Sequence, residues 1–257
     1  MGRLNFLGTG DPFNYERAQT ILALPLSGGQ TMLVDTSSGT NVLRQLHEAG
    51  IPPETVRHIF VSHRHFDHIG GLPPLLTTLV SLPGAEVTVY SLPTTIRAAR
   101  RLLELTIPGV EDWLGPRLRW QGLKAGEPIA IDGIEVTPFR VQHGLECIGF
   151  RFVQGDRVAV FTADTRPCPN MVKYARHAEL LIHEVYALDD QAEQAHFFGH
   201  STAADAGRAA REARVRRLTL THFRASAFID PEALRAEAEA HFDGPVDLAR
   251  DLCETEF

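Results

Sequence analysis

Three histidines and one aspartate fall within six residues, where positions 63–68 read His-Arg-His-Phe-Asp-His. The preceding apolar run at 59–61 predicts a buried strand, so the cluster follows a strand end, where open α/β sheets bind ligands. His63 and His65 are two residues apart, so in an extended segment both side chains point the same way and can bind one metal ion. Asp67 and His68 follow a turn and can face a second ion. This spacing favours a metal site over a solvated polar loop.

The second half of the chain repeats this arrangement of a strand followed by a polar residue. Predicted strands at 134–141, 157–161, 178–182 and 217–220 each lead to a side chain that can bind metal. Together with the cluster they supply five imidazoles and two carboxylates, which suit two divalent ions that share one carboxylate. Zinc is the default, with manganese and iron as alternatives. The seven candidate ligands are His63, His65, Asp67, His68, His143, Asp164 and His222.

Composition limits the class of protein. A chain of 257 residues can bury a sizeable core, and we expect one hydrolase domain over residues 1–257. The net charge of −7 argues against a surface that binds nucleic acid broadly, because phosphate binding requires clustered cations. The three cysteines form no C-x-x-C pair and indicate a reducing compartment. Without a long apolar run or a signal peptide, we expect a cytoplasmic protein and no membrane partner.

The remaining patterns predict alternating strands and helices. Strands at 20–26 and 30–34 form a hairpin, and helices cover 41–49, 75–82 and 94–105. The third helix is expected to bury Ile96, Leu102, Leu103 and Leu105 and to expose Arg97, Arg100 and Arg101. These arginines favour a solvated surface, with a polyanion contact as the alternative. Residues 107–116 are interpreted as a loop, either near the mouth of the site or in a contact surface.

The candidate ligands, from His63-x-His65-x-Asp67-His68 to His143, Asp164 and His222, resemble those of the metallo-β-lactamase superfamily of dinuclear hydrolases. The resemblance covers nearly the whole chain. It implies an α/β fold, the αβ/βα four-layer sandwich, with two mixed sheets face to face, helices on the outer faces and the metals at one edge. It also implies that Asp164 bridges two ions. One ion would be held by His63, His65 and His143, and the other by Asp67, His68 and His222.

Further segments resemble the ribonuclease Z branch of that superfamily, notably Gly-Thr-Gly at 8–10, Thr-Ala-Asp-Thr-Arg-Pro at 162–167 and Gly-His-Ser-Thr at 199–202. The resemblance implies that Glu184 and His200 act together near the scissile phosphate, and that the protein forms a homodimer. His183 and Glu184 alternate on a strand, so only one can face the metals, and the resemblance favours Glu184. Thr202 and Asp205 also fit a capping box at a helix start.

We therefore predict a two-zinc phosphodiesterase that uses a metal-activated water, with Asp67 orienting that water or accepting its proton. The substrate would be a small diester or an RNA 3′ end. Two departures from the ribonuclease Z pattern weaken the tRNA assignment: a tight turn at 154–156 replaces the long tRNA-binding arm, and Ser-Ser-Gly at 37–39 replaces Gly-Glu-Gly. The alternatives are a hydrolase of a lactone, thioester or aryl sulfate, and a non-catalytic binding protein on the same fold.

Overall fold

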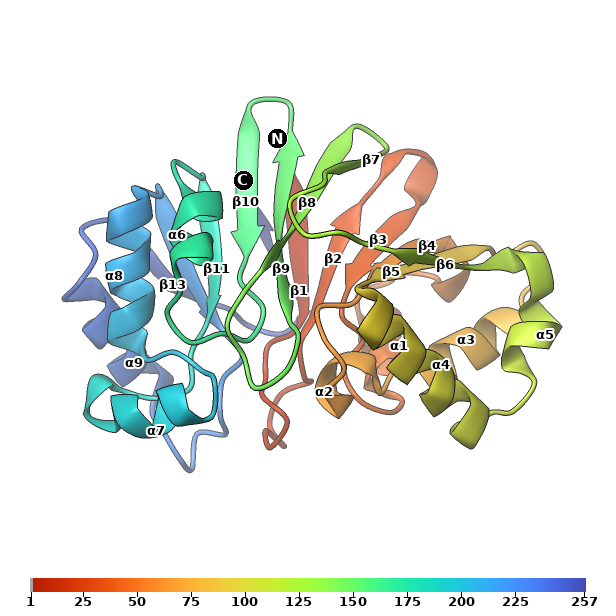
Figure 1. The fold of residues 1–257 in the computed structure, drawn as a ribbon, viewed down its shortest axis with the longest axis horizontal. Coiled ribbons are helices and arrows are strands. Elements are labelled where there is room, and N and C mark those ends of the chain that lie inside the picture. The colour runs from red at the N-terminus through yellow and green to blue at the C-terminus, as the bar shows by residue number, and fades with distance from the viewer. Residues whose placement is uncertain (1) are drawn as a thin grey trace.

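Two seven-stranded sheets lie face to face in the computed structural model, which describes residues 2–257 (Figure 1). The first sheet consists, in spatial order, of β14 (Cys253–Glu256), β1 (Arg3–Gly8), β2 (Ile21–Pro25), β3 (Thr31–Val34), β4 (Val56–Phe60), β5 (Val87–Ser91) and β6 (Leu118–Gly122). The second consists of β13 (Val246–Leu248), β12 (Arg217–Thr221), β11 (Leu180–Glu184), β10 (Arg157–Phe161), β9 (Ile148–Gln154), β8 (Ile134–Arg140) and β7 (Ile129–Ile131).

Both sheets are mixed, and they follow the same plan. In the first sheet, β14, β1, β2 and β3 pair antiparallel, and β3, β4, β5 and β6 pair parallel. In the second, the strands from β7 to β10 pair antiparallel and those from β10 to β13 pair parallel. The carboxyl ends of the parallel strands in each sheet therefore meet at one edge, where ligands bind in such sheets.

Helices cover the outer face of each sheet (Figure 1). The first sheet carries α1 (Asn41–Glu48), α3 (Leu72–Val80), α4 (Pro93–Thr106) and α5 (Val110–Leu114). The second carries α6 (Pro169–Ala175), α8 (Ala203–Ala213) and α9 (Pro231–Glu239), and the short helices α2 (Phe66–Ile69) and α7 (Ala192–Phe197) lie at the lower edge in Figure 1. The predicted αβ/βα sandwich is confirmed. No helix among residues 2–257 is long and apolar enough to cross a bilayer.

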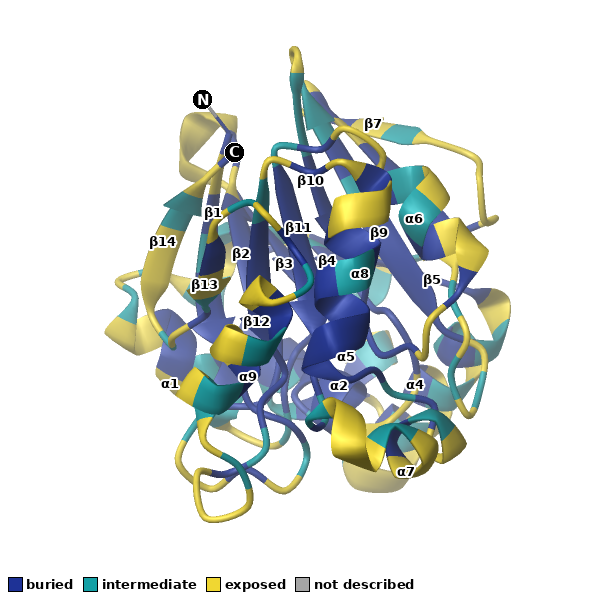
Figure 2. Ribbon diagram, turned by 90° about the vertical axis from the view of Figure 1, so that its left-hand side faces the viewer, coloured by how far each residue is buried: buried dark blue, intermediate teal, exposed yellow. Residues whose placement is uncertain are grey.

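Alternation along the strands divides the core into layers. Leu22 and Leu24 of β2 belong to the cluster that lies between the sheets, whereas Ile21 and Ala23 belong to the cluster beneath the outer helices. Successive side chains of a strand point to opposite faces, so strands covered on both sides are apolar throughout. Figure 2 shows the central strands of both sheets as mostly buried, whereas edge strands such as β14 and β7 carry exposed residues, as do the helices and loops.

The structure corrects two expectations in the first half. Leu105 is 67% exposed. The buried stripe of α4 runs through Thr95, Ala99 and Leu103, and two residues past Leu103 the helix has turned by more than half a revolution. Residues 107–116 are largely helical rather than a loop, because they contain α5, whose Val110 and Leu114 are buried. This helix lies at the outer end of the molecule and not at the mouth of the site (Figure 1).

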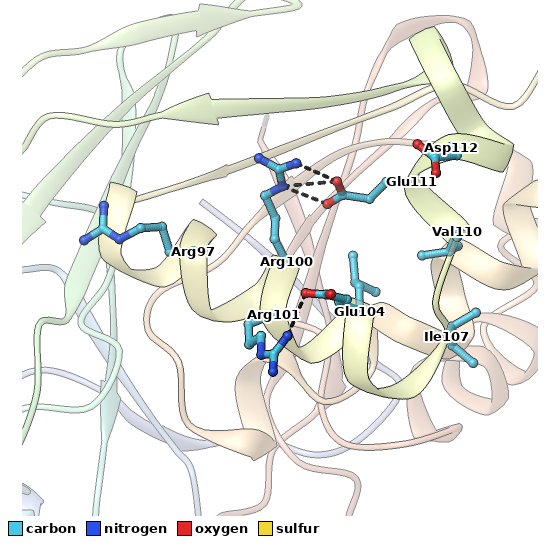
Figure 3. Close-up of a pocket in the computed structure, with 10 residues that line it drawn as sticks. Arg97, Arg100, Arg101, Glu104, Ile107, Val110, Glu111 and Asp112 are labelled. Carbon is cyan, nitrogen blue, oxygen red and sulfur yellow. Dashed lines mark hydrogen bonds and ion pairs between the residues drawn. The ribbon is translucent and has the colours of Figure 1, made fainter.

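The arginines of α4 are mostly paired with acids. Arg100 donates hydrogen bonds to both carboxylate oxygens of Glu111, and Arg101 forms an ion pair with Glu104 at 2.8 Å (Figure 3). Acidic residues thus neutralise two of the three cations on this helix. This favours the solvated surface over a polyanion contact.

The predicted capping box at the start of α8 is confirmed. The Thr202 hydroxyl accepts a hydrogen bond from the Asp205 N–H at 3.1 Å, and an Asp205 carboxylate oxygen accepts one from the Thr202 N–H at 3.1 Å. The Nε2 of His196, whose side chain is partly exposed, lies 2.7 Å from the same Asp205 carboxylate. These contacts fix the loop between α7 and α8, which carries His200 into the site.

The contact between α8 and α9 depends on Gly207. A Cβ at this position would lie too close to the Ala238 carbonyl oxygen and 3.0 Å from the Cβ of His241. Alanine in a helix gains about 1 kcal/mol over glycine, but overpacking costs about 1–3 kcal/mol. We expect Gly207→Ala to lower the free energy of unfolding by up to about 2 kcal/mol in urea denaturation. Gly144→Ala, where a Cβ meets open space, is the control and should change it by less than about 0.5 kcal/mol.

Candidate metal centre

All seven candidate ligands meet at the edge where the parallel strands end. His63 and His65 follow β4, Asp67 and His68 lie on α2, and His143, Asp164 and His222 follow β8, β10 and β12. They form two groups whose ligand atoms lie within 4.8 Å of one another. The first group is His63, His65, His143 and Asp164, and the second is Asp67, His68, Asp164 and His222. Asp164 belongs to both groups, so its carboxylate is placed to bridge two ions.

Hydrogen bonds orient three of the imidazoles. The Nδ1 of His68 donates to Asp35 at 2.8 Å, the Nδ1 of His63 to the Ser62 hydroxyl at 3.0 Å, and the Nδ1 of His143 to the Gly199 carbonyl at 2.8 Å. A histidine that donates through Nδ1 leaves the lone pair of Nε2 free for a metal, and such outer contacts are usual for metal-binding histidines. In all three residues Nε2 is therefore the atom available to bind a metal ion.

Asp35 is a site residue that the sequence analysis did not assign. It is fully buried and accepts hydrogen bonds from His68 and from the hydroxyl and N–H of Ser62. It follows β3, which pairs in parallel with β4, so its carboxylate lies beside the strand end that carries the histidines. The signal was present as a polar residue directly after an apolar strand. Its partner His68 is 33 residues away, and only the pairing of the strands brings them together.

Charge in the site favours a cation. Asp35, Asp67 and Asp164 are buried, and none pairs with lysine or arginine within residues 2–257. Burial alone would raise the pKa of Asp164, but His222, His68 and His63 hold it well below its usual value. Burial opposes the charging of His222, yet Asp164 and Asp67 raise its pKa to about 9.

These three carboxylates thus require positive charge close to them, since a buried anion without a counter-charge is strongly disfavoured. The Nε2 of His68 is buried and lacks a hydrogen-bond partner among the described residues. Divalent ions satisfy both requirements, because imidazole and carboxylate are the donors that zinc and its neighbours prefer. The residues present therefore fit a metal centre.

Glu184, not His183, faces this centre. The Nδ1 of His200 donates to a Glu184 carboxylate oxygen at 2.9 Å, and the Thr165 N–H donates to the same oxygen at 2.8 Å. His183 points the other way, with its Nε2 2.8 Å from the Met171 sulfur on α6. Burial would lower the pKa of His200, but the charge and hydrogen bond of Glu184 outweigh burial and raise it. His200 is therefore poised to carry a proton near neutral pH.

A pocket of about 390 Å³ opens onto the ligands. His65, Asp67, His143, Asp164 and His200 line it together with an apolar group of Pro12, Phe13, Phe66, Tyr186 and Phe198. The aromatic residues come from four separate segments in both halves of the chain, and the sequence analysis assigned a role to none of them. No lysine or arginine is among these lining residues.

Comparison with known proteins places this centre in a family. Residues 30–223 match the family model described as beta-lactamase superfamily domain. The chain is 30% identical to a ribonuclease Z of Myxococcus xanthus, over 97% of this chain and 95% of that protein. The alignment spans 307 positions against the 257 residues of this chain, so the relative carries insertions that this chain lacks.

Two solved structures share the fold. One is the metallo-beta-lactamase fold protein YhfI from Bacillus subtilis, which is 25% identical with a TM-score of 0.84 and matches over 100% of both chains. The other is the short form of human tRNase Z, which is 26% identical with a TM-score of 0.77 and matches over 99% of this chain and 98% of that chain. Similarity to a ribonuclease Z and a tRNase Z agrees with the resemblance found in the sequence.

Proposed function

Because the chain belongs to the β-lactamase superfamily of metal-dependent hydrolases, we propose that it is a two-zinc phosphodiesterase of the ribonuclease Z type. The observation that supports this most directly is that seven candidate ligands and the His200–Glu184 pair meet at one edge of the sheets, where four of the ligands and His200 line one pocket. The ribonuclease Z relatives support phosphodiester chemistry over the hydrolysis of a lactone, thioester or aryl sulfate.

In this proposal the two groups of ligands hold one ion each. His63, His65 and His143 would bind the first ion, Asp67, His68 and His222 the second, and Asp164 both. Divalent ions held in this way supply an activated water as the nucleophile and offset negative charge that develops on the phosphoryl group.

The protein's own side chains divide the proton transfers. Asp67 lies in the floor of the pocket and would orient the water or accept its proton. His200 lines the pocket and would donate a proton to the leaving oxygen. Glu184 is fully buried and does not line the pocket, so it is a positioning residue that keeps His200 oriented and protonated.

The proposed substrate is a small phosphodiester rather than a large folded RNA. Binding a polyanion requires several cationic contacts away from the scissile bond, and no lysine or arginine lines the pocket. Residues 154–156 form only a tight turn between β9 and β10, in which Gly155 has a φ of 63°. The guanidinium of Arg217 donates hydrogen bonds to the Glu256 carbonyl and the Thr255 hydroxyl. These features leave little surface for the body of a tRNA.

We expect clear hydrolysis of bis(p-nitrophenyl) phosphate by the zinc-loaded protein. Precursor tRNA should bind weakly, with a KM that rises steeply between low and physiological salt. The test compares a phosphodiester, a phosphomonoester, a lactone, a thioester, an aryl sulfate and precursor tRNA side by side. If the protein hydrolyses the lactone, the thioester or the aryl sulfate faster than the phosphodiester, the proposed phosphodiesterase activity is contradicted. A low KM for tRNA that does not change with salt would show that another surface replaces the missing arm.

Asp35 offers a test of the metal centre that does not depend on substrate. Removing an outer hydrogen bond from a metal-binding histidine commonly weakens metal affinity by about 10- to 100-fold. We expect Asp35→Asn, which keeps the size of the side chain but removes its charge, to weaken zinc binding by that factor in a competition titration. Asp247→Asn, a change in an exposed side chain on β13, should leave zinc affinity unchanged. Equal affinity in both variants would contradict the role given to Asp35.

A further inference from the structure

The mouth of the pocket is lined by aromatic rings that remain exposed to solvent. Phe13 is 71% exposed, Phe66 57% and Phe198 49%, and all three line the pocket. Exposed apolar groups that gather at one site mark a binding surface, whereas single exposed ones require no explanation. Figure 1 shows the loop after β1, α2 and α7 along the lower edge, and the lining residues come from both halves of the chain.

The rings lie directly beside the proposed metal ligands. His65, Asp67, His143 and Asp164 form the polar part of the pocket and the rings form its apolar part. A phosphate held at the polar part would therefore place its organic substituent among the rings. Tyr186 extends this surface, since its ring stacks on that of His200 with 5.2 Å between centroids and 14° between planes.

Size and charge limit what this surface can bind. A volume of about 390 Å³ lies in the range of small-molecule sites. No lysine or arginine lines the pocket, so the organic group is recognised by stacking and not by a basic side chain. Among the substituents of a phosphodiester, a nucleobase has the flat π-face that stacks on aromatic side chains.

We propose that Phe13, Phe66 and Phe198 form a stacking subsite for a nucleobase next to the scissile phosphate. This rests on the proposed phosphodiesterase function and specifies its substrate as a short nucleotide diester. Stacking of one base is worth about 1–3 kcal/mol, which corresponds to roughly 5- to 100-fold in affinity. Every base has a π-face, so the subsite tolerates sequence variation. The preference is also insensitive to salt, unlike binding through phosphate contacts.

Two substrates with one leaving group test the subsite. Thymidine 5′-(p-nitrophenyl phosphate) carries a base, and methyl p-nitrophenyl phosphate does not. We expect the zinc-loaded protein to favour the thymidine diester by roughly 5- to 100-fold in kcat/KM at both low and high salt. Phe13→Ala and Phe198→Ala should each reduce this ratio at least 5-fold, and Phe198→Tyr should preserve it. Trp113→Ala, which removes an exposed aromatic side chain on α5, is the matched control and should keep the ratio.

A binding measurement separates this inference from the proposed reaction. Calorimetry should show thymidine 5′-monophosphate binding more tightly than methyl phosphate, with the difference reduced in Phe198→Ala. The subsite is contradicted if both diesters are hydrolysed with equal kcat/KM, or if the ratio of their kcat/KM values is unaffected by the two alanine variants. Either result would leave the proposed phosphodiesterase activity intact. A third outcome is that neither diester is hydrolysed but the difference in binding persists and depends on Phe198. That outcome would support the stacking subsite and contradict the proposed phosphodiesterase activity.

Discussion

Asp164→Ala is expected to release at least one of two bound metal ions and to abolish hydrolysis. The Asp164 carboxylate belongs to both groups of candidate ligands, so its loss weakens both proposed metal sites at once. It also removes one of the three buried carboxylates whose charge the ions would balance. Metal content per chain, measured after purification and dialysis, should be close to two in the parent protein and one or fewer in the variant.

Asp205→Ala is the control for this measurement. Asp205 is also buried, but it serves the capping box of α8 and belongs to neither group of ligands. Its removal should lower the free energy of unfolding by about 0.5–2 kcal/mol while the chain still binds two ions. Loss of stability and loss of metal are thereby separated. Full metal occupancy in Asp164→Ala would remove Asp164 from the bridging position.

His200→Ala is expected to lower kcat by roughly 10²- to 10⁴-fold, the usual contribution of one positioned acid or base. Metal content should not change, because His200 is outside both proposed ligand sets. The loss should be smaller for substrates with a good leaving group, such as p-nitrophenolate, since these require little proton donation. Steady-state rates for a series of leaving groups of rising pKa provide the measurement. An equal loss for all members, or release of zinc, would contradict the role of His200.

Glu184→Gln provides the matched variant for His200, because it keeps the hydrogen bond but removes the charge. Glu184 holds the pKa of His200 above its usual value in spite of burial. The protonated form required of an acid therefore persists to higher pH and is lost as pH rises through the raised pKa. In Glu184→Gln the alkaline limb of the rate profile should move to lower pH. If the alkaline limb stays at the same pH in Glu184→Gln, a group other than His200 determines its position.

The cluster of ligands at 63–68 could be predicted from the sequence because its residues are close together in the chain. His63, His65, Asp67 and His68 lie in a six-residue segment that begins three residues after the end of β4, so the spacing alone brings them together. The apolar runs predicted individual strands, whereas the two mixed sheets were implied by the resemblance to the metallo-β-lactamase superfamily. The choice between His183 and Glu184 was different, because alternation on a strand shows only that the two diverge. The packing of His183 against Met171 on α6 decides which one turns inward.

Features made by distant segments were not predictable in this way. Asp35 reaches His68 only through the pairing of β3 with β4. Phe13 and Phe198 line one pocket although 184 residues separate them in the chain. In the sequence each of these phenylalanines resembles an ordinary apolar residue in a loop or a short helix. No local period distinguishes an exposed ring at a site from a buried ring in the core, because only tertiary structure determines exposure.

The pairing of β14 with β1 affects how the chain folds during synthesis. Glu256 lies opposite Arg3 and Cys253 opposite Phe6, so the strand on one side of β1 comes from the opposite end of the sequence. On a ribosome, β1 emerges early, and its free edge stays open until residues 253–256 have left the exit tunnel. An unpaired strand edge is a template for association with other chains. The edge of β1 is therefore protected from such association only after β14 has paired with it.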